Sequence, residues 1–265
     1  MSNVIEMLHE VGFYAVSPEW ENEEALSEIV AETKKNNMIV QSLHAPYMKA
    51  DGLWNKEEVI SAPAKNEIIE IIDVCAKYKI PILVMHVWIG FDYYSELGDL
   101  YYGVFDEIVE YAEKAGIQLA FENTEGQEFL FALLDRYAEN DIVGFCWDSG
   151  HEMCYNHSSD LLKLYGDRLI MTHINDNLGV SDPNGKIVWT DDLHLLPFDG
   201  IADWDYNIER LIDAKKIDIL NLEISRTSKP NRNENDDYRQ ISLLQYFEEA
   251  YKRGCKIADK YSNNS

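Results

Sequence analysis

Hydrophobic positions along the chain follow two patterns, short apolar runs and longer segments with apolar residues three or four apart. Short runs rich in β-branched and aromatic residues are typical of strands, whereas the three-to-four spacing is typical of helices that bury one face. Seven runs fit strands: Phe13–Val16, Ile39–His44, Ile82–Val87, Gln118–Asn123, Gly144–Asp148, Leu169–Asn175 and Asp218–Glu223.

Helical spacing occupies several of the segments between these runs, as in Ala62–Tyr78 and Tyr102–Ala115. The chain also opens in a predicted helix, Val4–Gly12, and closes in another, Ile241–Tyr261. Alternating strands and helices predict βα units around a parallel sheet. At 265 residues the chain has the usual size of one such barrel. The predicted fold class is therefore α/β, a (β/α)8 TIM-type barrel forming a single domain over residues 1–265, and a missing first strand stays an open alternative.

The charge balance narrows the classes of partner. The formal net charge is −25, from 48 acidic and 23 basic residues, and such a field repels polyanions. No nucleic acid partner is expected. No apolar run approaches the roughly 20 residues that span a bilayer, so no membrane partner is expected either. The first residues lack the basic and apolar segments of a signal peptide, and four cysteines without CxxC spacing suit thiols in a reducing compartment. The expected location is the cytoplasm.

The ionisable residues cluster in a regular way, because most predicted strands end on a side chain that can bind a metal ion. Two loop motifs, Asp-x-x-His and Asp-x-His, add further candidates. Since the carboxyl ends of barrel strands meet at one mouth, we expect all of these side chains to be neighbours. They are His44, His86, Glu122, Asp148, His151, His173, Asp192, His194 and Glu223.

Each of these residues has an ordinary structural interpretation when taken alone. A single His at a strand end is more often hydrogen-bonded structure than a ligand, and an Asp before Ser-Gly is commonly a turn residue or a helix cap. Together, however, buried carboxylates and imidazoles are costly without a cation. Oxygen and nitrogen donors without thiolate suit Mn²⁺, Mg²⁺, Co²⁺ or Zn²⁺. The sequence therefore predicts a divalent-metal site, with one ion expected first and up to three left open.

The substrate class is predicted from what surrounds these strand ends. No glycine-rich phosphate loop is present, and the nearest basic residues in sequence are Lys49, Lys186 and Arg226, so a phosphate group has no evident clamp. Aromatic residues such as Tyr47 and Trp88 follow the predicted strands and fit either sugar stacking or ordinary packing. An unphosphorylated small-molecule carbohydrate is favoured as the substrate.

These motifs resemble the xylose isomerase-like barrels, over about Gly12 to Ser225. That superfamily holds ketose epimerases, isomerases and dehydratases of hydroxypyruvate and inosose metabolism, and the endonuclease IV enzymes. Resemblance to the ketose epimerases implies one ion held by Glu122, Asp148, His173 and Glu223. It also implies that the catalytic residues Glu122 and Glu223 exchange a proton beside the substrate carbonyl, through a metal-stabilised enediolate.

The endonuclease IV enzymes provide a rival resemblance. All nine candidate residues have counterparts among their ligands for three zinc ions, and the Glu-Asn-Thr string at Glu122 agrees as well. This resemblance implies a zinc phosphodiesterase, in which His44, His86, His151, Asp192 and His194 hold additional metal. In the epimerase alternative the same five residues bind substrate. A keto-sugar or inosose dehydratase and a non-catalytic binder are further alternatives, and the acidic balance favours the carbohydrate enzymes.

The chain departs from the epimerases at one motif. An Arg usually follows the residue that matches His173 in that branch, whereas Asn175, Asp176 and Asn177 stand here. We therefore expect other residues to bind the substrate oxygens that this arginine binds in the epimerases. The turn-rich loop from Asn177 to Leu193 is the predicted lid, and since barrels of this superfamily commonly pair, a homodimer is also expected.

Overall fold

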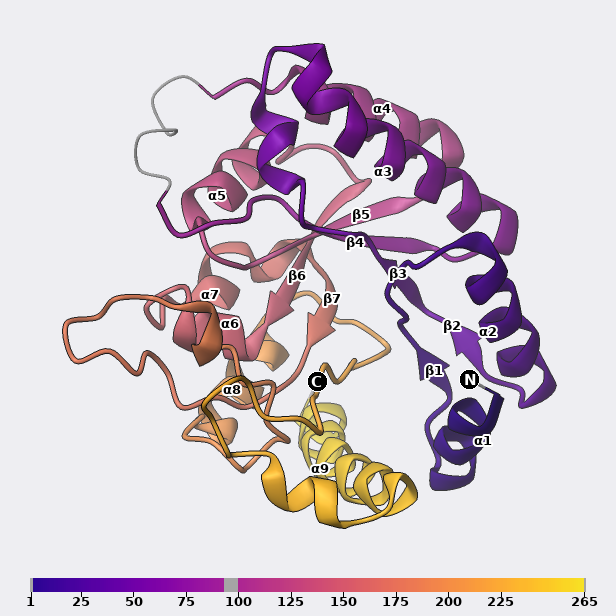
Figure 1. The fold of residues 1–265 in the computed structure, drawn as a ribbon, viewed down its shortest axis with the longest axis vertical. Helices are drawn as coiled ribbons and strands as arrows, with labels where there is room; N and C mark the ends of the chain where they lie inside the picture. The colour runs from indigo at the N-terminus through magenta and orange to yellow at the C-terminus, as the bar shows by residue number, and fades with distance from the viewer. Residues whose placement is uncertain (1, 93–99, 265) are drawn as a thin grey trace. The chain divides into compact units, whose positions relative to one another are not determined.

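The computed structural model describes residues 2–92 and 100–264 (Figure 1). The chain consists of two compact units, one formed by Met1–Glu6 and Tyr14–Gly144 and the other by Met7–Phe13 and Phe145–Ser265. A single domain over the whole chain stays a prediction.

The strands of the first unit are parallel, as the alternation of strands and helices predicts. β1 (Ala15–Val16) pairs with β2 (Ile39–Val40). β3 (Ser42–His44), β4 (Ile82–His86) and β5 (Gln118–Glu122) follow one another in a sheet. Its register places His86 directly beside Glu122, so the polar ends of β4 and β5 lie at the same level.

The helices of the first unit are α2 (Glu23–Lys35), α3 (Glu58–Tyr78), α4 (Gly103–Ala115) and α5 (Gln127–Arg136), with a short 3-10 helix η1 (Ala50–Trp54) before α3. α3 and α4 lie side by side along β4 and β5 (Figure 1). Their apolar faces are buried, with Ile71, Ile72, Phe105 and Ile108 fully enclosed. Each such side chain contributes roughly 1.5–3 kcal/mol by leaving water. α4 ends where Gly116 adopts φ +72°, a left-handed conformation that glycine takes without strain.

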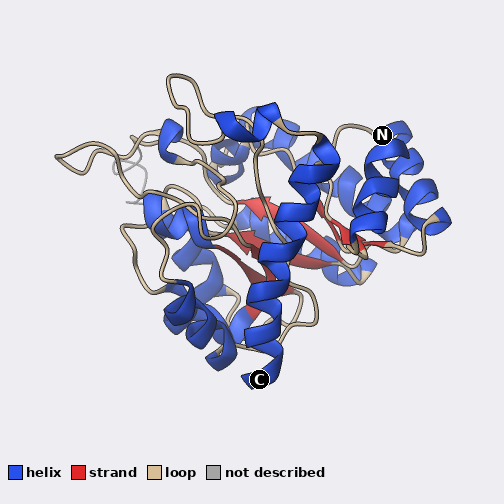
Figure 2. Cartoon of the chain, turned by 90° about the horizontal axis from the view of Figure 1, so that it is seen from below, coloured by secondary structure: helices blue, strands red, loops and turns tan. Residues whose placement is uncertain are grey.

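β6 spans Val143–Asp148, and its residues from Phe145 onward belong to the second unit. The other strand of this unit is β7 (Leu169–His173). The two strands are parallel, and Asp148 lies beside His173. Helices α8 (Trp204–Asp213) and α9 (Leu243–Asn264) pack together, and α9 is the long helix that ends at the label C in Figure 2. The remaining helices are α6 (Ser149–Cys154), α7 (Leu161–Tyr165) and the 3-10 helices η3 (Gly166–Arg168), η4 (Trp189–Asp191) and η5 (Asp236–Gln240).

The chain opens in a helix, α1 (Ser2–Val11), as predicted, and the first strand that the structure describes is β1. Phe13, just after α1, packs edge-on against Tyr251 of α9 with ring centroids 5.1 Å apart. It thereby joins the apolar cluster around Leu196, Tyr246 and Ala250 in the second unit.

Two strand predictions need correction. The run Ile39–His44 is divided at Gln41 into β2 and β3, because Gln41 N donates to Val16 O while His44 N donates to Pro18 O. The run Asp218–Glu223 is wrong as a strand, since it makes only a single parallel bridge between Leu222 and Ile174. Thr172 Oγ1 accepts from Asn221 N at 3.0 Å, so a hydroxyl takes the place of a backbone acceptor there.

The predictions about helices and thiols agree better with the structure. α3 and α4 end where their predicted segments end, although α3 begins four residues earlier and α4 one residue later, and α9 is shifted by two residues at its start and three at its end. Cys75, Cys146, Cys154 and Cys255 form no disulfide. Within the described ranges, no helix combines the length and the apolarity needed to cross a bilayer.

Candidate metal and active site

In the first unit, three of the predicted residues meet at the carboxyl ends of β3, β4 and β5. Glu122 is fully buried, and its Oε2 lies 3.2 Å from His44 Nε2 and 3.4 Å from His86 Nε2. The two imidazole rings are edge to face, with centroids 5.0 Å apart. A buried carboxylate therefore faces two imidazole nitrogens, the donor set that divalent cations bind.

The orientation of His44 indicates which of its nitrogens is available as a ligand. His44 Nδ1 lies 2.9 Å from the carbonyl oxygen of Ala45, which can only accept, so Nδ1 carries the hydrogen. In the neutral ring, Nε2 then carries a lone pair, and this lone pair points at the Glu122 carboxylate. Two such electron-rich atoms attract one another only through a cation, either a proton or a metal ion.

Tyr47 extends this group toward solvent. Its ring stacks on His86 with centroids 4.5 Å apart and an interplanar angle of 22°, and the residue is 40% exposed. A part-exposed aromatic face beside polar donors suits the apolar face of a sugar ring. The sequence indicated this aromatic residue without showing what it would contact.

In the second unit, Asp148 is held from two sides at the end of β6. Its Oδ1 accepts from the backbone N of His151 at 2.6 Å, which makes Asp148 the N-cap of α6. Its Oδ2 accepts from Asn175 Nδ2 at 2.8 Å. The structural interpretation of Asp148 as a helix cap is thus confirmed. Each carboxylate oxygen has a second lone pair, so capping leaves capacity for a cation.

His173 and Glu223 meet beside Asp148. His173 Nδ1 lies 3.2 Å from Glu223 Oε2, and the exposed fractions of the two side chains are 3% and 28%. The backbone bridge between Leu222 and Ile174 places Glu223 next to His173, because Glu223 N donates to Ile174 O at 3.2 Å. The prediction that Glu223 ends a strand is wrong, yet Glu223 still lies beside the end of β7.

The remaining three predicted residues form a second group in this unit, which we call the His151–Asp192–His194 cluster. Asp192 Oδ1 lies 2.7 Å from His194 Nε2 and 3.4 Å from His151 Nε2. Their potential ligand atoms lie within 4.8 Å of one another, close enough to share an ion. His194 Nδ1 is 3.2 Å from the carbonyl oxygen of Glu223, so this ring also directs Nε2 at a carboxylate.

The charges of this cluster shift its pKa values in opposite directions. Burial lowers the pKa of His194, but the carboxylates of Asp192 and Glu223 outweigh burial and raise that pKa to about 9. Burial raises the pKa of Asp192, but the charges of His194 and His151 outweigh it and hold that pKa well below its usual value. Without a metal ion, the cluster contains a charged imidazole at neutral pH.

A pH dependence of stability follows for metal-stripped protein. The pKa of His194 is raised from about 6.5 in the unfolded chain, so its contribution is fully present below pH 6.5 or so and is lost as the pH rises through about 9. We expect urea unfolding in the presence of a chelator to show declining stability across this window. His194→Gln should remove that decline, and an unchanged decline in the variant would show that another group causes it.

Asn175 was not among the predicted site residues, but the structure shows that it contacts one of them, Asp148. It is fully buried, and it donates to Asp148 Oδ2. Ser149 Oγ donates to Asn175 O and accepts from Asn175 N, which fixes its backbone. A Cβ at Gly150 would lie 1.9 Å from Asn175 Oδ1, so only glycine leaves room for this side chain. The Asn-Asp-Asn string was the available signal.

Asn175→Ala should weaken divalent-metal binding about 10- to 100-fold, the usual cost of losing a hydrogen bond that orients a ligand. The Asp148 carboxylate would lose the donor on Oδ2 that sets its direction. Titration of metal-stripped protein with Mn²⁺ measures this effect. Asn184→Ala, at an exposed position, is the matched control. Equal affinity in both variants would mean that Asn175 does not position a ligand.

Asp176, next in the chain, is a structural anchor instead. Its buried carboxylate accepts from Phe198 N, Ala202 N and Trp204 Nε1 at 2.9–3.0 Å. Asp176 therefore holds the loop that precedes α8 and the first residue of that helix. Of the basic residues nearest in sequence to the strand ends, Lys49 pairs with Glu67 and Arg226 donates to the carbonyl of Tyr238.

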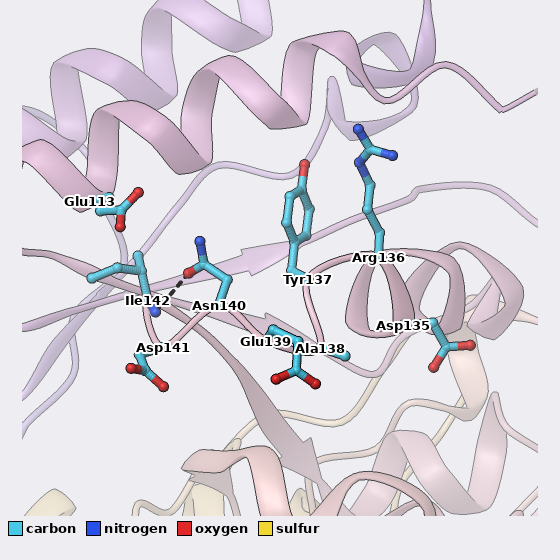
Figure 3. A pocket seen from close by; sticks show the side chains of 9 residues that line it. All are labelled: Glu113, Asp135, Arg136, Tyr137, Ala138, Glu139, Asn140, Asp141 and Ile142. Carbon is cyan, nitrogen blue, oxygen red and sulfur yellow. Dashed lines mark hydrogen bonds between the residues drawn. The ribbon is translucent and has the colours of Figure 1, made fainter.

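A surface pocket of about 540 Å³ lies elsewhere in the first unit (Figure 3). It is lined by the end of α5 and the loop that precedes β6, and Asn140 Oδ1 accepts from Ile142 N there. Gln118 Nε2 lies 3.5 Å from Asp141 O, which places this loop at the amino end of β5, away from Glu122. None of the predicted site residues lines the pocket, and in barrels that end is not where catalysis occurs.

Parallel strands alternate with helices, and β3 to β7 each end on a side chain that can bind a metal ion, an arrangement typical of an α/β barrel with its site at the carboxyl ends of the strands. The chain belongs to the xylose isomerase-like TIM barrel family, whose sequence model matches residues 3–245. The predicted fold class and superfamily are thereby confirmed.

Solved structures agree with this assignment. Similar folds include a xylose isomerase domain protein from Planctomyces limnophilus, at 17% identity and a TM-score of 0.69, covering 96% of this chain and 93% of that one. The IolI protein with a bound zinc atom has 19% identity and a TM-score of 0.70, covering 100% and 94%. D-psicose 3-epimerase in the presence of D-fructose has 16% identity and a TM-score of 0.66, covering 98% and 93%. These identities show the fold alone.

One curated relative has higher identity over a shorter segment. The uncharacterized protein y4fM of Sinorhizobium fredii is 36% identical over 146 residues. That segment is 51% of this chain and 44% of the relative, so the match spans less than half of the relative's length.

Proposed function

We propose that the protein is a metal-dependent sugar isomerase or epimerase that removes a proton next to a carbonyl group. The observation that carries this proposal is Glu122, a fully buried carboxylate at a strand end that faces the Nε2 atoms of His44 and His86. Epimerases among the proteins of similar fold support the same class of chemistry.

The metal ligands we propose are Glu122, Asp148, His173 and Glu223. Each lies at or beside the carboxyl end of a strand, and in a barrel of this family those ends open on one mouth. Three carboxylates and one imidazole suit Mn²⁺, Mg²⁺, Co²⁺ or Zn²⁺. A divalent ion bound by them would supply positive charge to the substrate oxygens as a proton leaves the neighbouring carbon.

The two glutamates divide the proton transfer in this proposal. One carboxylate takes the proton from the carbon beside the carbonyl, and the other returns a proton to the opposite face or to the neighbouring carbon. Glu122 is fully buried, whereas the Glu223 side chain is 28% exposed, so Glu223 is the one that exchanges its proton with solvent more readily. His44, His86 and His151 would hydrogen-bond substrate hydroxyl groups.

A panel of ketoses and aldoses, followed by NMR, tests this function. We expect interconversion of at least one pair, loss of turnover after chelation, and recovery on addition of a divalent ion. Because Lys49, Arg226 and Lys229 each contact another group of the protein, unphosphorylated sugars should be better substrates than their phosphates. Turnover that persists at full rate without metal would contradict the proposal.

A zinc phosphoesterase is the second candidate, and the His151–Asp192–His194 cluster favours it by bringing three further ligand atoms together. Hydrolysis of a model phosphodiester that depends on His194 would support this candidate. We also propose that the isomerase forms a homodimer and is located in the cytoplasm.

A further inference from the structure

The polar segment after Glu223 is hydrogen-bonded to the loop that carries Asp192 and His194, two members of the His151–Asp192–His194 cluster. Arg232 Nη1 lies 3.0 Å from Asp191 Oδ1, and Asn235 Nδ2 donates to Leu193 O at 3.3 Å. Asp191 is fully buried and Asn235 is 1% exposed. Residues 229–235 are thus held against residues 189–193 from more than one point.

This attachment places Lys229 at the cluster. Its Nζ lies 3.0 Å from Asp192 Oδ2 and 5.8 Å from the centre of the Trp189 ring, and its side chain is 24% exposed. Asp192 therefore faces two imidazoles with one oxygen and an ammonium with the other. The negative charge of this carboxylate is already balanced by a cation that belongs to the chain.

A metal ion at the same cluster would have to share Asp192 with that ammonium. Both cations would lie against one carboxylate, and like charges at such a separation repel strongly where the surroundings are partly buried. The donors of the cluster suit a divalent ion in type and spacing, whereas the neighbouring charge does not.

We propose that the Lys229 ammonium, held against Asp192, excludes a divalent ion from the His151–Asp192–His194 cluster. The cluster then presents hydrogen-bond donors to substrate oxygens in place of a metal ion. This inference goes beyond the proposed function, because it concerns a second group of ligand atoms and does not require the proposed metal ligands to bind an ion.

The test compares the number of Zn²⁺ ions bound per chain, by calorimetric titration of metal-stripped protein. We expect Lys229→Met to bind one more Zn²⁺ than the wild type, and the additional ion to be lost again in Lys229→Met with His194→Ala. Lys229→Arg keeps the charge and should retain the wild-type number. The matched control is Lys65→Met, which removes a part-buried lysine paired with Glu107 at 2.7 Å, and it should also retain that number.

Two outcomes would overturn the inference. One is an unchanged number of ions in Lys229→Met protein whose circular dichroism matches the wild type. The other is the loss of one ion when His194→Ala is made in the wild type, because the cluster would then already hold metal. If the wild type binds no Zn²⁺ and Lys229→Met binds one through His194, the proposed function fails while the role of Lys229 stands.

Discussion

Glu122→Gln should lower kcat by about 10²–10⁴-fold, the usual contribution of a general acid or base, and leave the fold intact. A carboxamide is nearly the same size as a carboxylate but cannot take up a proton at neutral pH. It also removes the negative charge that faces His44 and His86. The measurement is turnover of the best sugar substrate at saturating metal, with thermal unfolding to check the fold.

Glu125→Gln is the matched control for this experiment. Glu125 is also buried, and its Oε1 accepts from Gly90 N at 2.9 Å, a hydrogen bond that a carboxamide oxygen can keep. We expect its kcat to stay within a few-fold of the wild type. A Glu122→Gln protein as active as the Glu125→Gln protein would remove Glu122 from the catalytic machinery.

Arg210→Met should destabilise the protein by about 3–5 kcal/mol, the cost of removing one partner of a buried ion pair. Arg210 in α8 contacts Glu152 Oε1 at 2.7 Å and Asp160 Oδ1 at 2.9 Å, and the Arg210 and Glu152 side chains are 10% and 7% exposed. Burial raises the pKa of Glu152, although Arg210 opposes that shift. Without the arginine, Glu152 must either ionise unpaired or take up a proton.

Denaturant unfolding of Arg136→Met provides the comparison. Arg136 contacts Asp106 at 2.6 Å, but the two side chains are 40% and 43% exposed, so solvent already screens the pair. Its loss should cost no more than about 1 kcal/mol. Equal losses in both variants would mean that burial does not determine the contribution of Arg210.

Much of the fold could be predicted from the sequence, because strand and helix periodicities are local properties of the chain. The helices α3 and α4 show this well, since their apolar faces are the faces that they bury. The absence of a strand around Leu222 could not be predicted, because the apolar run of this segment is typical of a strand. What breaks the ladder is the hydroxyl of Thr172, nearly 50 residues away.

For the candidate site, the possible metal ligands could be predicted from the sequence, but the residues that contact them could not. Metal-capable residues at strand ends are visible in the sequence, and the structure brings them together within each unit. Asn175 and Lys229 were missed because neither carries a carboxylate or an imidazole, the groups from which the metal site was predicted. Their roles depend on which side chain they contact, Asp148 for Asn175 and Asp192 for Lys229, and that is a property of tertiary structure.

The central claim is that the protein transfers a proton beside a carbonyl group, and solvent deuterium tests it most directly. The reaction of wild-type protein with its best sugar would be run in D₂O, and the product examined by NMR and mass spectrometry. We predict one deuterium at the carbon that receives a proton, because the carboxylate that returns the proton exchanges its own proton with solvent. Sustained turnover with no deuterium in the product would contradict this account.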